Sequence, residues 1–199
     1  MSAVPPFRLL RLHLASRRVL PALVAVGAFA LALRLTAHWL HTPGAWTRTV
    51  PLITVLGAAA VIGVTTWNPL GEVEGTAGHH LPGLRFGTVL LTVATAAIVF
   101  GAAAASSAVP GGCTTLLRQL AGLTGIALLS AALLGARQSW TVPLVYTLVC
   151  ARAFDLGWAS LWVWPTRTGP DTAATAVAAG LLAAGLGVIA LRGPRDNAP

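Results

Sequence analysis

The chain has 199 residues, of which 56% are hydrophobic and 9% are charged, and its formal net charge is +8. So few charges cannot cover the surface of a soluble domain of this length, so we expect a protein embedded in a lipid bilayer. All thirteen basic residues are arginines scattered around apolar runs, without the basic stripe of a nucleic-acid-binding protein.

Residues 7–18 predict an amphipathic helix at the membrane surface. Arg8, Arg11 and Arg18 would share one helical face, and Phe7 and Leu10 would lie on another. The alternative is the basic start of a signal peptide. We disfavour cleavage because the apolar run continues past any cleavage motif and further apolar runs follow.

The remaining chain predicts an all-α fold with six transmembrane helices in one domain covering residues 1–199. About 20 apolar residues are needed to cross the hydrocarbon core as a helix. The segments that meet this length are roughly 19–40, 50–67, 86–108, 115–134, 140–161 and 172–191.

The arginines predict that both termini lie in the cytoplasm, because cytoplasmic segments are enriched in basic residues. With that orientation eight arginines lie inside, whereas three lie outside or at the outer interface. The inner ones are Arg8, Arg11, Arg17, Arg18, Arg85, Arg137, Arg192 and Arg195; the outer ones are Arg48, Arg118 and Arg167.

Between the second and third spans, residues 68–85 then form the longest internal cytoplasmic loop. Asn68 can cap a helix, Pro69 suits its first position, and Glu72 and Glu74 complement the helix dipole. A short exposed helix of this kind suits docking, and a merely solvated loop helix is an equal alternative.

Three ionisable residues are expected at membrane depth, where desolvation makes a charge a functional candidate: Arg34, Arg152 and Asp155. Arg34 can instead snorkel to the outer headgroups. Arg152 and Asp155 are three residues apart on one helix, so a local ion pair is favoured over a substrate site.

Two features of the last spans concern packing. Trp158, Trp162 and Trp164, followed by Pro165, suit a short helix that dips back into the outer leaflet, with interfacial anchoring as the alternative. Small residues crowd the fourth and sixth spans and predict close helix packing. They are Ala121, Gly122, Gly125 and Ala132 in one span and Gly180, Ala183, Ala184 and Gly187 in the other.

Nothing in the sequence indicates an enzyme or a metal site. The chain has no lysine, which excludes a Walker A loop, so this chain is not itself a P-loop ATPase. Hydrolase and zinc-protease motifs are also missing. Glu72, Glu74, His79 and His80 do not have the spacing of one convergent metal site.

The layout resembles the membrane-spanning subunit of ABC-2 type transporters, particularly short actinobacterial permeases. The resemblance rests on the basic N-terminal helix, on NPLGEVE at 68–74 and LPGLR at 81–85, on LRQLAGLTG at 117–125, and on Gly135-Ala136-Arg137 with Trp140 and Pro143. It extends to WVWP at 162–165, before the last span.

The resemblance implies a permease in the plasma membrane that exports an apolar or amphipathic substrate. Residues 7–18 would be the connecting helix, and 68–85 the coupling segment seated on a separate ATPase that binds ATP and Mg. Glu72, Glu74, His79 and Arg85 are the candidate coupling residues. The permease would form a homodimer or pair with a paralogous subunit, and residues 158–165 would be the outer re-entrant segment.

The alternative function is a non-transporting polytopic membrane protein, such as an immunity factor or an anchor subunit of a membrane complex. The short loops and the lack of a hydrophilic pathway motivate it. An intramembrane enzyme is disfavoured because no acid, base and nucleophile converge.

Overall fold

The computed structural model describes residues 19–37, 46–66, 81–105, 109, 111–157, 161–167 and 169–192. Their regular structure is helical throughout. The long helices are α2 (Val19–Ala37), α3 (Trp46–Val64), α5 (Leu81–Ala105), α6 (Gly112–Leu134), α7 (Thr141–Asp155) and α8 (Thr172–Arg192). Two short 3-10 helices, η1 (Ala136–Gln138) and η2 (Leu161–Thr166), flank α7.

Each predicted span therefore overlaps one α-helix, but among the described residues three of these helices meet the length and hydropathy expected of a membrane crossing. These are residues Phe86–Ala105 of α5, together with α6 and α8. The apolar stretches of α2 and α3, Leu20–Thr36 and Thr49–Val64, are shorter. The fifth span was predicted over residues 140–161, whereas α7 ends at Asp155 and the chain turns at Gly157, with φ 71°.

Several threonine hydroxyls in these helices bond to carbonyls of their own helix. The Oγ1 atom of Thr36 donates to the Ala32 carbonyl at 2.7 Å, and that of Thr92 donates to the Val89 carbonyl at 2.8 Å. Thr54 does the same toward the carbonyl of Pro51, inside α3. A hydroxyl that finds a partner one turn back does not need water, so it is tolerated in an apolar environment.

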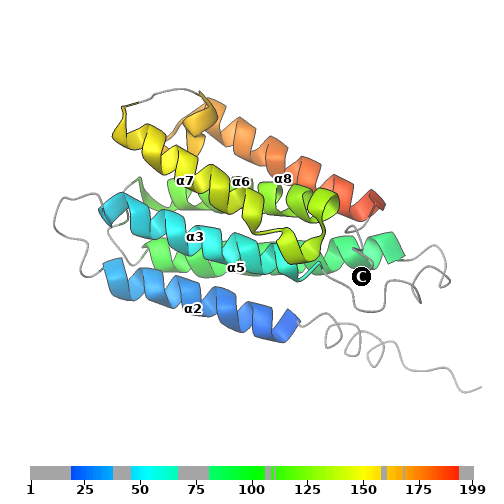
Figure 1. The fold of residues 1–199 in the computed structure, drawn as a ribbon. Helices are drawn as coiled ribbons and strands as arrows, with labels where there is room; N and C mark the ends of the chain where they lie inside the picture. The colour runs from blue at the N-terminus through cyan, green and yellow to red at the C-terminus, as the bar shows by residue number, and fades with distance from the viewer. Residues whose placement is uncertain are drawn as a thin grey trace, which may run out of the picture.

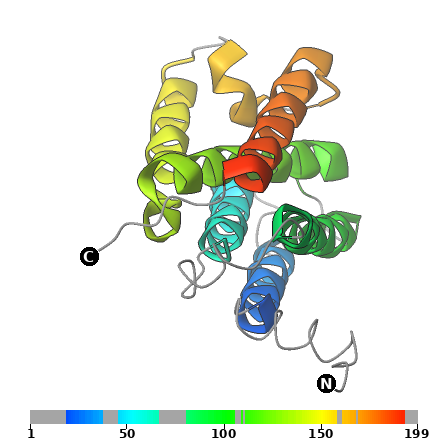
Figure 2. The ribbon, with the colours of Figure 1, turned by 90° about the vertical axis from the view of Figure 1, so that its right-hand side faces the viewer.

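Helix α6 is the centre of the molecule. It packs against α3 and α5 and also against α7, α8 and η2. Viewed along the long direction of the bundle, α6 crosses between α2, α3 and α5 on one side and α7, η2 and α8 on the other (Figure 1, Figure 2). Leu116, Leu120, Leu123 and Leu128 of α6 are at most 1% exposed and form the middle of the core.

The prediction of close packing by small residues holds for α6 and needs correction for α8. A Cβ on Gly125 would lie 2.5 Å from the Leu181 carbonyl oxygen, so the two backbones touch there. The glycine of α8 that meets α6 is Gly185, where a Cβ would lie 2.7 Å from the Gly125 carbonyl oxygen. Gly180 and Gly187 instead have open space around them.

Large apolar side chains cover the outward faces of the bundle. Leu20 of α2 is 76% exposed and Ile98 of α5 is 72% exposed, and α7 exposes Val145 and Leu148 in the same way. A water-soluble monomer rarely exposes so much contiguous apolar surface, whereas a bilayer covers it without cost.

Candidate functional site

A short segment between α7 and α8 is packed into the bundle rather than looping over it. Trp164 of η2 is 1% exposed, and its indole lies against Gly122 of α6, where an added Cβ would fall 2.5 Å from the Cζ2 atom. Gly122 is ten residues after the start of α6. At 1.5 Å per residue, the indole therefore lies about 15 Å from the start of α6, measured along the helix axis.

Helix α7 holds the other side of the segment. The Tyr146 hydroxyl donates a hydrogen bond to the Trp162 carbonyl, and the Tyr146 ring lies 6.4 Å from the Trp164 ring, centroid to centroid. The Cys150 thiol lies 4.0 Å from the same Trp162 carbonyl. Cys150 and Val163 are buried in one small apolar cluster between α7 and η2.

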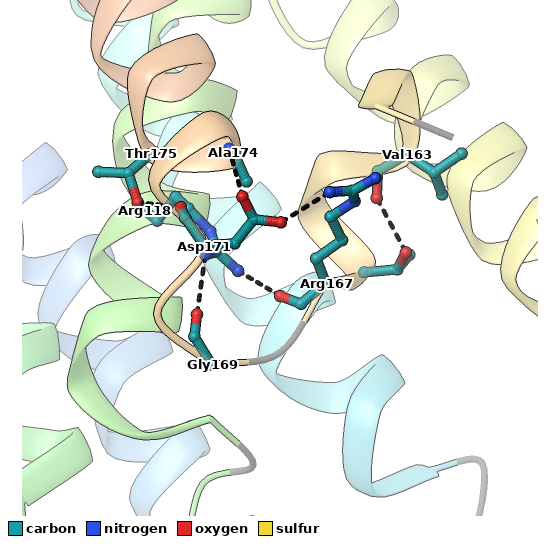
Figure 3. Close-up of polar contacts among 8 residues, drawn as sticks. Arg118, Val163, Arg167, Gly169, Asp171, Ala174 and Thr175 are labelled. Atoms are coloured by element: carbon teal, nitrogen blue, oxygen red, sulfur yellow. Dashed lines mark hydrogen bonds and ion pairs between the residues drawn. The ribbon is translucent and has the colours of Figure 1, made fainter. Parts of the chain in front are cut away.

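Two polar side chains of α6 bind the backbone of this connection. Arg118, which is 5% exposed, donates from Nη1 to the Gly169 carbonyl at 3.0 Å and from Nη2 to the Arg167 carbonyl (Figure 3). The neighbouring Gln119, also buried, donates from Nε2 to the Pro165 carbonyl. Three carbonyls within five residues are thus bound by consecutive residues of one helix.

Arg167 and Asp171 complete the polar group at the start of α8. Arg167 Nη1 and Asp171 Oδ2 are 2.7 Å apart, and Asp171 Oδ1 accepts a hydrogen bond from the Ala174 backbone N–H at 3.0 Å (Figure 3). Asp171 is therefore the N-cap of α8. The Ala174 N–H, and then the Arg167 guanidinium, hold the pKa of the Asp171 carboxyl below its ordinary value.

The positive charge of this polar group exceeds its negative charge, because Arg118 and Arg167 face the single carboxylate of Asp171. Among the described residues, Arg118 Nε and Gln119 Oε1 are buried without a hydrogen-bond partner. A buried guanidinium bound only by neutral carbonyls is costly to hold in an apolar environment. The burial of Arg118 is therefore weak evidence for a contribution to stability.

Most of the residues predicted from the sequence lie outside the part of the chain that the structure describes. The coupling residues Glu72, Glu74 and His79, the connecting-helix residues Arg8, Arg11 and Arg18, and Trp158 fall outside the described residues. Arg85 belongs to the start of α5, and its side chain is likewise outside the description.

Of the three ionisable residues expected at membrane depth, Arg34 and Arg152 are both exposed on the outer faces of α2 and α7. Asp155 is the last residue of α7, and its side chain is outside the described part. The buried arginine is Arg118, which the sequence had placed at the outer interface. A polar Arg-Gln pair two turns into an apolar helix was the available signal for it.

Of the three tryptophans predicted for a re-entrant segment, Trp164 is buried in the bundle and Trp162 is 42% exposed. No group of three His, Cys, Asp or Glu residues gathers in the part of the chain that the structure describes. The site described above consists of hydrogen bonds and charged side chains around the backbone of residues 165–171.

The apolar outer surface and the three long apolar helices define the chain as a helical membrane protein. Comparison with protein-family models, with curated proteins and with solved structures finds no match to this chain.

Proposed function

We propose that the chain is the membrane-spanning subunit of an ABC-2 type transporter in the plasma membrane. Its six helices would all cross the bilayer, with both termini in the cytoplasm. A separate ATPase subunit, which binds ATP and Mg, would drive export of an apolar or amphipathic substrate. The working unit would contain two such membrane subunits, either two copies of this chain or this chain and a paralogue.

The observation that carries the proposal is the η2 segment, packed between the last two long helices. The sequence resemblance predicts an outer re-entrant segment at residues 158–165. Trp164 of this segment is buried against Gly122, about three turns from the start of α6. A simple surface loop would leave this tryptophan at the interface. The support from the structure is the burial of Trp164 against Gly122 of α6, and the support for the family comes from the sequence motifs.

The coupling loop provides the sharpest test of this function. The chain is co-purified with an ATPase encoded beside it, and Glu72→Lys and Glu74→Lys are compared with Asp196→Lys, an acid near the C-terminus. Charge reversal in the loop should abolish association and the stimulation of ATP hydrolysis, because it places positive charge against the proposed cationic contacts of the ATPase. The Asp196→Lys variant should behave as the unaltered protein.

Intact association and hydrolysis in both loop variants would refute the coupling role of residues 68–85. Failure of every ATPase tested to associate with the unaltered chain would favour the alternative, a non-transporting membrane protein that serves as an immunity factor or an anchor subunit.

A further inference from the structure

Glycines in the left-handed conformation stand at both ends of the η2 segment. Gly157 follows α7 with φ 71° and Gly169 precedes α8 with φ 89°. A Cβ at either position would meet no atom within 4 Å, so neither glycine is required by packing. Both are instead places where the backbone changes direction without steric penalty, which is what a hinge requires.

The side-chain hydrogen bonds that hold the segment in place end on backbone carbonyls, and three of them come from α6 while one comes from Tyr146 of α7. Arg118 binds the carbonyls of Arg167 and Gly169, and Gln119 binds that of Pro165. Val163 lies in the middle of η2 with φ −92° and ψ 26°, so the segment is not a continuous helix that would hold itself straight. Its position therefore depends on partners outside it.

A native thiol lies beneath the segment. Cys150 is 0% exposed and is five residues before the end of α7, so it is close to the end of the bundle from which η2 enters. Its neighbours in the buried cluster are Val163 of η2 and Tyr146 and Ala153 of α7. If η2 moves away from α7, Val163 no longer covers Cys150, and the thiol becomes accessible to reagents.

We propose that Arg118 is the positioning residue that latches the η2 segment onto α6. Its planar guanidinium supplies two parallel donors, which suit two carbonyls of one turn of chain. With both bonds made, Trp164 is held on Gly122 and Cys150 is covered. Without these two hydrogen bonds, residues 161–167 rotate away from α6 around the hinges at Gly157 and Gly169. The surface of Gly122 that Trp164 contacts and the Cys150 thiol are then both exposed.

The test measures reaction of Cys150 with N-ethylmaleimide in lipid nanodiscs. The background is Cys113→Ala, which leaves Cys150 as the single cysteine of the chain. Arg118→Gln should react about ten- to hundredfold faster than the background protein, because it removes two hydrogen bonds from a charged donor. Arg192→Gln removes the same charge from an exposed position at the far end of α8, and should leave the rate unchanged.

Two further variants test the same proposal if the Arg118→Gln protein cannot be produced in folded form. Arg118→Lys keeps the charge without the planar fork and should give an intermediate rate. Gly122→Ala displaces the Trp164 ring without altering Arg118 and should also speed the reaction, whereas Gly180→Ala, on an open face of α8, should not.

General loosening is separated from local opening by a second reporter. Ser130→Cys, in a chain whose own cysteines are replaced by alanine, places a thiol at a position 3% exposed in the second half of α6. It should stay protected when Arg118 is replaced. Equal acceleration at residues 130 and 150, or a rate for Arg118→Gln equal to that of Arg192→Gln, would overturn the latch. Because the readout is thiol accessibility, the result is independent of whether the protein transports.

Discussion

Arg118 shows how the environment of a single residue depends on segments distant in the sequence. It lies six residues after the start of α6, where an arginine ordinarily reaches the headgroups and stays hydrated. The two carbonyls that accept its hydrogen bonds, those of Arg167 and Gly169, are about 50 positions further along the chain. The segment that contains them covers the guanidinium and keeps it from solvent. The residue is thereby changed from an interfacial anchor into a buried donor.

The ionised carboxylate of Asp171 is predicted to stabilise the folded protein. Its folded pKa is lowered, so its ionised form stabilises the folded state above the ordinary carboxyl pKa of about 3.9, and this stabilisation is lost as pH falls through the lower folded value. Asp171→Asn retains an N-cap acceptor but loses the ion pair with Arg167. The variant should melt at a lower temperature than the unaltered protein at pH 7.

The measurement is Tm as a function of pH for both proteins. Their difference should be largest above about pH 5 and should shrink as pH falls through the lowered pKa of Asp171 in the folded protein. The other acids titrate in both proteins and cancel in this difference. A constant Tm difference over the whole range would show that the ionised carboxylate of Asp171 does not stabilise the fold.

At the scale of elements, the contact between α6 and α8 depends on glycine. Gly125 and Gly185 bring the two backbones within van der Waals contact, and the apolar residues Ala174, Ala178 and Ile189 of α8 are buried along the same side. In lipid, helices are not driven together by exclusion of water from their apolar faces, so close contact over a large area supplies much of the association. This explains why small residues matter more here than hydrophobicity.

Gly125→Ala should destabilise the bundle by about 1–3 kcal/mol, because the new methyl group collides with the backbone of α8 at Leu181. The matched control is Gly187→Ala in α8, where a Cβ meets no atom within 4 Å. The control gains helix propensity of up to about 1 kcal/mol. Unfolding in mixed detergent measures both, and equal stabilities for the two variants would contradict the close contact.

At the scale of the whole molecule, the helices pack around the central α6 and expose apolar faces on the outside of the bundle. Helices α5, α6 and α8 are long enough to cross the hydrocarbon core, and α7, with 15 residues, is about 22 Å long. The η2 segment follows α7 and fills the space beside the start of α6. A shorter helix completed by a packed segment would still bury the backbone polar groups that lipid cannot satisfy.

Membrane topology is the corresponding prediction. If all six helices cross the bilayer, reporters fused at residue 1 and at residue 199 should both be on the cytoplasmic side, and a reporter inserted at Gly44 should be outside. Alkaline phosphatase and green fluorescent protein fusions report the two sides. Termini found on opposite sides would mean that an odd number of helices crosses, and the six-span arrangement would then be wrong.

The lipid environment and the helical secondary structure could both be predicted from the sequence alone. Apolar runs of nearly 20 residues favour helices in lipid, because a helix satisfies its own backbone hydrogen bonds. Each of the six α-helices overlaps one of the six predicted runs, with ends that differ by several residues. The tryptophans before Pro165 also marked η2 as unusual. These features are local, so a single segment contains the information needed to predict them.

Which polar and small residues are buried could not be predicted in this way, because it depends on how the helices pack. Gly185 rather than Gly180 meets α6, Arg118 rather than Arg34 or Arg152 is enclosed, and Trp164 rather than Trp162 fills the bundle. Each of these outcomes depends on the rotation of a helix about its axis and on what a distant segment places against it. Weak amphipathic patterning leaves that rotation undetermined when lipid and protein interior are equally apolar.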